Sequence, residues 1–176
     1  MKIAKRILPV ILMIWPYTFV AYLFCSDNGD SILWPIIAYI LATVLVYGVN
    51  IVNALMFLRK TKASESALFG MLLKIVHIPF YVIVFLFGMM SFGILAIMPG
   101  NILTAPFMVL VLFIIDIALM ATTSIYSLSA ILKMVLAKKM RISTALILGF
   151  LSFIFITDVI CSVIIFVKAK RSEKVK

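Results

Sequence analysis

Two aspartates lie inside long apolar stretches of the chain, Asp116 in FIIDIAL and Asp158 in ITDVICSVI. A carboxylate at the centre of a membrane is costly and usually marks a functional site. If both stretches are membrane-crossing helices, each carboxyl lies roughly 14–15 Å from the outer end of its helix, at 1.5 Å rise per residue. Two facing carboxyls at one level would share a proton or bind a cation between them. Alternatively, each is protonated and hydrogen-bonded separately, as a contact between helices.

Other polar residues recur at helical spacing beside these aspartates. One face of the segment that contains Asp116 also carries Met120, Thr123 and Ser127, and an earlier segment carries Tyr39, Thr43, Tyr47, Asn50 and Asn53 on one face. Such stripes could lead an ion or proton from mid-membrane to the cytosolic side. The candidate ion- or proton-binding residues are therefore Asp116, Asp158, Thr43, Thr123 and Asn50. Ordinary Ser, Thr and Asn packing between membrane helices is the alternative.

Lys74 and His77 form a second candidate pair, because residues three apart lie on one helical face. They could bind a lipid headgroup or another anion at the inner membrane interface. Alternatively, their polar ends simply reach headgroup water while their stems stay in the apolar region.

Signatures of catalysis and metal binding are missing from the sequence. It contains no phosphate-binding glycine loop, no HExxH and no nucleophile elbow. His77 is the sole histidine, which excludes a histidine-based metal cluster, and Cys25 and Cys161 form no metal motif. We therefore expect no catalytic residues, no metal, no cofactor and no enzymatic activity. An enzyme acting on lipids or peptides would have to use Lys74 and His77, which lack a carboxylate nearby in sequence.

The elements that carry these residues follow from composition. The chain has 176 residues, of which 66% are apolar and 12% charged, against about half and about a quarter in soluble domains. This excludes a soluble enzyme and a nucleic-acid-binding domain. About 20 continuous apolar residues cross a membrane as a helix, and five segments qualify. We predict an all-α, polytopic transmembrane bundle in one domain, residues 1–176, with spans in Ile7–Cys25, Ile32–Leu58, Ala67–Met98, Pro106–Leu136 and Thr144–Val167.

Two of these segments are longer than one perpendicular crossing requires. We divide the third into an interfacial helix, Ala67–Ile78, and a span from Pro79 to Met98. The fourth spans Pro106–Tyr126 and continues through Ser127–Leu136 into the cytosolic interface. Steep tilt of the whole helices is the alternative.

Basic residues set the orientation. They precede the first segment and fill the links after the second and fourth, whereas the links SDNGDS and PGNILTA have none. By the positive-inside rule, this indicates a multi-pass protein of the cell membrane with a cytoplasmic N-terminus, whose basic links contact anionic lipids of the cytoplasmic leaflet. Five crossings, however, place the basic tail KAKRSEKVK outside. Either the tail is translocated or one segment is re-entrant.

Several motifs in the second half of the chain occur in a recognisable order. LLKIVHIPFYVIVFLFG (Leu72–Gly88) is followed by a span with a central aspartate, by TSIYSLSAI and by a last span with TDV. This pattern, from about Leu68 to the C-terminus, resembles a family of small bacterial membrane proteins of unknown function. The resemblance implies an integral bacterial membrane protein and implies no activity.

Two functions compete. The first is a non-catalytic accessory, scaffold or regulatory component that contacts the lipid bilayer and another membrane protein or a second copy, and no nucleic acid. The second is a small proton- or cation-linked transporter or channel that uses Asp116 and Asp158.

Overall fold

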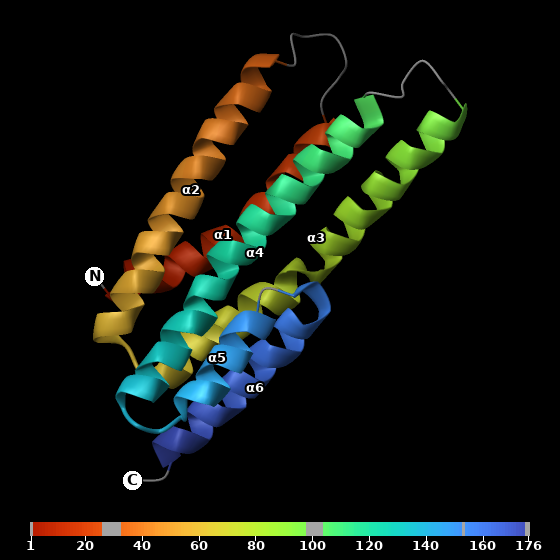
Figure 1. The fold of residues 1–176 in the computed structure, drawn as a ribbon. Helices are drawn as coiled ribbons and strands as arrows, with labels where there is room; N and C mark the ends of the chain where they lie inside the picture. Colours follow the sequence, from red (N-terminus) through yellow and green to blue (C-terminus); the bar gives the residue numbers. More distant parts are fainter. Residues whose placement is uncertain (1, 26–32, 98–103, 153, 175–176) are drawn as a thin grey trace.

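The computed structural model describes residues 2–25, 33–97, 104–152 and 154–174. Within these ranges the regular structure is six α-helices (Figure 1): α1 (Lys2–Cys25), α2 (Leu33–Lys60), α3 (Ala63–Ile97), α4 (Thr104–Leu136), α5 (Ile142–Leu151) and α6 (Phe155–Lys174). The prediction of an all-α bundle is confirmed, because the apolar segments do form helices. Pro9, Pro16 and Pro79 lie inside helices without ending them.

Helices α1 to α4 run alternately up and down the bundle, and α5 and α6 form a shorter hairpin beside them (Figure 1). The α3–α4 pair forms the centre: α2 and α6 both pack against α4, and α1 and α6 pack against α3. Gly70 permits the close approach of α3 to α4. A Cβ at this position would lie 2.5 Å from the Ser127 hydroxyl oxygen and 3.0 Å from the Ser127 amide nitrogen.

Apolar side chains cover the outside of the bundle, and many polar side chains lie inside it. Leu41, Val44 and Leu45 of α2 are each 66% exposed, and large apolar residues of α3 and α4 are exposed in the same way. The buried side chains include Asn50, Asn53, Ser66, Lys74, His77, Thr123, Ser124, Ser127, Ser129, Ser152, Asp158 and Ser162. Soluble proteins favour the opposite distribution of large charged and apolar residues.

Three helices of the described residues are long and apolar enough to cross a membrane, in the ranges Ile37–Leu58, Ala63–Gly93 and Val109–Leu136. The apolar part of α1, Arg6–Tyr22, is shorter, and so is α5. The expected number of five spans is therefore wrong. The second and fourth predicted segments correspond to α2 and α4, whereas the third and fifth need correction.

The fifth predicted span is two helices that turn back on each other. Helix α5 has 10 residues, about 15 Å at the usual rise, and α6 then runs in the opposite direction (Figure 1). Polar side chains bind carbonyl groups where the helix breaks. The Ser124 hydroxyl donates to the Ser152 carbonyl at 2.9 Å, and the Thr157 hydroxyl donates to the Leu151 carbonyl at 2.9 Å. Because carbonyls at a helix end need partners, these bonds stabilise a turn that the apolar composition conceals.

The hairpin returns α6 to the end of the bundle where α1 begins (Figure 1). There the Ser64 hydroxyl donates to Glu173 Oε2 at 2.7 Å, and the Ser64 amide donates to Glu173 Oε1 at 3.1 Å. Arg6 Nη2 lies 2.8 Å from Glu65 Oε1, and Lys139 donates to the Ser172 carbonyl. The last turns of α6 thus lie at the same end as the basic links. The last predicted span therefore does not carry the tail to the far end of the bundle, because it folds back as the α5–α6 hairpin.

The predicted interfacial helix Ala67–Ile78 is not a separate element, because α3 continues through Pro79 to Ile97. Its polar face points into the bundle. The buried residues of α3 recur every three or four positions and include both charged and apolar side chains: Leu73, Lys74, His77, Phe80, Tyr81 and Val84. This stripe makes the first half of α3 a core helix, since its polar side chains meet partners on α1 and α6.

Candidate functional site

A buried ion pair joins α3 to α6. Lys74 Nζ donates to Asp158 Oδ1, and the two side chains are 0% and 3% exposed. Asp158 lies in the first turn of α6, where the helix dipole favours a negative charge. Breaking a buried pair of this kind by removing one partner costs about 3–5 kcal/mol. The pair therefore holds the hairpin against the centre of the bundle.

His77 lies one turn along α3 and is also fully buried. Its Nδ1 lies 2.5 Å from the Leu73 carbonyl oxygen, and its Nε2 lies 3.2 Å from the Leu12 carbonyl oxygen of α1. The expectation that Lys74 and His77 reach headgroup water is wrong for this fold. Neither residue has a surface that an anion or a lipid headgroup could reach in the structure, because neighbouring helices enclose both side chains.

A second polar cluster joins α2, α3 and α4 around Tyr126. Asn53 Nδ2 donates to the Tyr126 hydroxyl oxygen at 3.1 Å, and that hydroxyl donates to Asn50 Oδ1 at 3.0 Å. On α3, the Ser66 hydroxyl donates to the Tyr126 carbonyl at 3.0 Å. Asn50, a predicted path residue, thus lies in a hydrogen-bonded contact between helices.

The two threonines predicted to line an ion path are placed apart. Thr43 Oγ1 accepts a hydrogen bond from Trp15 Nε1 at 2.9 Å and donates to the Tyr39 carbonyl at 2.8 Å, which joins α1 to α2. Thr123 is buried and donates to the Met120 carbonyl of its own helix at 3.0 Å. Each threonine has a local bonding role, and these hydrogen bonds do not link either of them to an aspartate.

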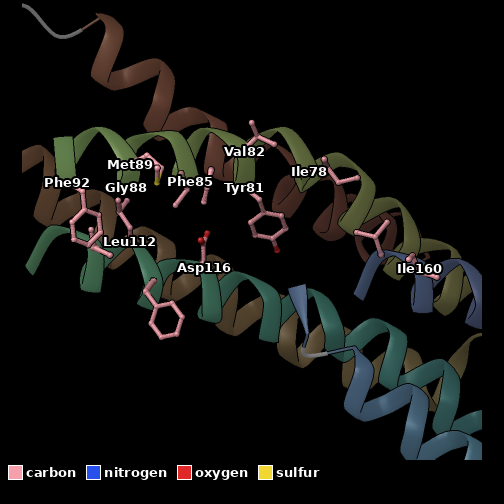
Figure 2. A pocket seen from close by; sticks show the side chains of 14 residues that line it. Ile78, Tyr81, Val82, Phe85, Gly88, Met89, Phe92, Leu112, Asp116 and Ile160 are labelled. Carbon is pink, nitrogen blue, oxygen red and sulfur yellow. The ribbon is translucent and has the colours of Figure 1, made fainter. Parts of the chain in front are cut away.

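Asp116 has a different environment from the other candidates. It lies on α4, it is half-buried, and its Oδ1 is buried without a hydrogen-bond partner. Its carboxyl points into a groove of about 730 Å³ between α3 and α4, toward Tyr81 and Phe85 (Figure 2). Of the described residues that line this groove, Asp116 is the sole charged one, and most of the others are apolar or aromatic.

The groove follows from the length of the hairpin. The groove is lined at one end by Val159 and Ile160, close to the start of α6. From there toward its C-terminal end, α6 packs against both α3 and α4. Farther along, the residues of α3 and α4 that face the groove are not covered by α6, since that helix begins only at Phe155. Because the hairpin covers only half the length of the α3–α4 pair, the groove stays open along the other half.

The two aspartates thus lie in separate environments, because Asp158 pairs with Lys74 whereas Asp116 Oδ1 has no hydrogen-bond partner. Asp158 is on the returning arm of the hairpin, so the calculated depth that assumed an outward-running helix was wrong. Among the described residues, no ion pair or hydrogen bond joins Asp116 to Asp158, and Lys74 binds Asp158 instead. The residues that the sequence interpretation missed are Tyr126 and the aromatic lining of the groove. The opposite charges of Lys74 and Asp158, both in apolar segments, were an available signal for their pairing.

A bundle with an apolar exterior, a buried Lys–Asp pair and a half-length hairpin defines a class of small, all-helical proteins suited to an apolar environment. More particularly, the chain belongs to a family of unknown function (DUF6652), whose model matches residues 4–171. The match extends well beyond the stretch from Leu68 that carried the resemblance. Comparison with curated proteins and with solved structures gave no match.

Proposed function

We propose that this protein is a non-catalytic component of the cell membrane, accessory or regulatory, that binds another membrane constituent in its α3–α4 groove. One observation carries the proposal. The buried charged and imidazole groups, Lys74, Asp158 and His77, bond within the bundle, whereas Asp116 faces an open groove with a partnerless oxygen. Ionisable groups at membrane depth are usually functional, so the groove is the surface on which binding is expected.

In the proposed orientation α2, α3 and α4 cross the bilayer, and the α5–α6 hairpin enters from the cytoplasmic side. Helix α1 is the fourth crossing, because its apolar part, Arg6–Tyr22, has the roughly 17 residues that are the lower limit for a span. In the described chain, every lysine and arginine except Lys74 lies in four stretches of sequence, 2–6, 59–62, 133–141 and 168–174. The contacts of Arg6, Ser64 and Lys139 gather these stretches at one end of the bundle. The positive-inside rule assigns that end to the cytoplasm, where each basic residue near anionic lipid contributes about 1 kcal/mol.

The ion-linked transporter is the alternative, and the partnerless oxygen of Asp116 is what favours it. It requires a second ion-binding group within reach. Asp158 is neutralised by Lys74, and Thr43, Asn50 and Thr123 bond to other groups. A membrane component that binds a ligand needs only the groove and no second ion-binding group. Binding is therefore better supported than ion-linked transport.

Site-specific photo-crosslinking in the native membrane tests the proposal. A photoreactive phenylalanine analogue replaces Phe85, which lines the groove and is 65% exposed. The matched control replaces Leu45, which is 66% exposed on α2. We expect a discrete adduct, identified by mass, from position 85 alone, and its loss in Asp116→Asn. Lipid adducts of equal yield at both positions would contradict the proposed function.

A further inference from the structure

We infer that the α3–α4 groove binds a hydrophobic organic cation, of the quaternary ammonium or phosphonium class, that is dissolved in the membrane. The inference rests on the proposed function and names the chemistry of the ligand. It combines four features of the groove: one carboxylate, an aromatic lining, a volume suited to a small molecule, and access from the side.

The charge comes from Asp116 alone. Its Oδ1 is buried without a hydrogen-bond partner, and the described residues around it in the groove supply no cation. An ionised group in an apolar region is costly unless it is paired. A positive ligand is therefore the natural complement of this groove.

Aromatic rings line the rest of the groove on both helices. Tyr81, Phe85 and Phe92 come from α3 (Figure 2), and Phe113 comes from α4. The faces of aromatic rings attract organic cations, and rings around a quaternary ammonium group are a recurrent recognition device. The same groove thus offers aromatic side chains for the hydrophobic parts of the ligand, and Asp116 with the ring faces for its positive centre.

The size of the groove suits a small molecule. Its volume of about 730 Å³ lies within the roughly 300–1,000 Å³ of small-molecule pockets. The lining of α3 extends from Ile78 to Phe92, about 21 Å at the helical rise. A drug-sized organic molecule therefore fits the groove.

Three other cation sources fit less well. An inorganic divalent cation needs about six oxygen ligands, and Asp116 is surrounded by carbon-rich side chains. A lipid headgroup lies too far away, because Asp116 is 12 residues into α4, about 18 Å along the helix. A second copy offers no free basic group at this level, since the described lysines and arginines lie at one end of the bundle or, for Lys74, in the buried pair.

The groove opens to the side of the bundle. Phe85, Met89 and Phe113 line it and are also exposed on the outer surface of α3 and α4. If α3 and α4 cross the bilayer as proposed, this surface faces lipid. A ligand that partitions into the membrane can therefore enter laterally, without a passage through water.

Equilibrium binding of two probes of equal shape and opposite charge tests the inference. The probes are tetraphenylphosphonium and tetraphenylborate, and the protein is the full chain in lipid nanodiscs. We expect wild type to bind the phosphonium at least tenfold more tightly than the borate. Asp116→Asn should weaken phosphonium binding at least tenfold, and Asp116→Glu should restore most of it. Glu65→Gln, which removes a carboxylate outside the groove, should leave binding unchanged.

The outcomes separate this inference from the proposed function. Equal binding of both probes to wild type, a comparison that needs no variant, would overturn the inference. So would phosphonium binding that Asp116→Asn leaves intact. The inference would also be overturned if a designed transmembrane peptide with one central lysine bound to the groove and the phosphonium did not. If the phosphonium fails while the discrete adduct at position 85 persists, the ligand class is wrong and the proposed binding role stands.

Discussion

Replacing one member of the Lys74–Asp158 pair should destabilise the protein more than replacing both. Lys74→Met keeps an unbranched side chain and leaves the Asp158 carboxylate buried without its partner. Because the side chains are 0% and 3% exposed, solvent screens the loss very little. Removing one partner of a buried pair costs about 3–5 kcal/mol, whereas replacing both with apolar residues is close to neutral or stabilising.

The corresponding change in Tm is measurable. At roughly 2–4 °C per kcal/mol for a chain of this length, Lys74→Met should lower Tm by roughly 6–20 °C. The double variant Lys74→Met, Asp158→Leu should recover most of that loss. Thermal unfolding in nanodiscs, followed by tryptophan fluorescence, measures both. A single variant as stable as wild type, or a double variant no more stable than the single, would refute the reasoning.

A second measurement shows which part of the structure is loosened when the Lys74–Asp158 pair is lost. Cys161 lies on α6, one turn beyond Asp158, and is buried. In a Cys25→Ser background, Lys74→Met should accelerate maleimide labelling of Cys161, because α6 is held less firmly against α3. Unchanged labelling together with a lowered Tm would mean that the pair stabilises the bundle without attaching the hairpin.

Three further predictions concern packing, topology and the basic end. Gly70→Ala should cost about 1–3 kcal/mol by overpacking, because the added Cβ meets Ser127, whereas Gly48→Ala has open space and should be neutral in the same thermal assay. Green fluorescent protein fused to the C-terminus should fluoresce and alkaline phosphatase fused there should be inactive, and the reverse result would contradict the re-entrant hairpin. Burial alone would raise the pKa of Glu173, but hydrogen bonds from Ser64 and nearby lysines lower it below its ordinary value of 4.5. The Ser64–Glu173 contact should therefore be formed above about pH 4.5 and lost as the pH falls through the lowered pKa. Spin labels on α3 and α6 near this contact measure the result. The distance between them should increase on acidification in wild type but not in Glu173→Gln.

Local sequence was sufficient for most of the helices. Continuous apolar runs predict helices wherever they occur, and α2 and α4 begin and end within a few residues of the predicted limits. The same argument failed at α5 and α6. The turn around Ser152 depends on hydrogen bonds from Ser124 of another helix and from Thr157, so apolar composition alone does not show it. The basic tail was the one sequence feature that pointed to a re-entrant segment.

The sequence by itself determined that the chain is helical and apolar outside, which residues are the rare charged ones within apolar segments, and that basic residues gather at a few points. These are properties of composition and position along the chain. Only the tertiary structure decided that Asp158 pairs with Lys74, that Tyr126 joins Asn50 and Asn53, and that Asp116 faces a groove. Those outcomes depend on which faces of separate helices meet, and a helix whose surface is apolar nearly all round gives little indication of which face is turned inward.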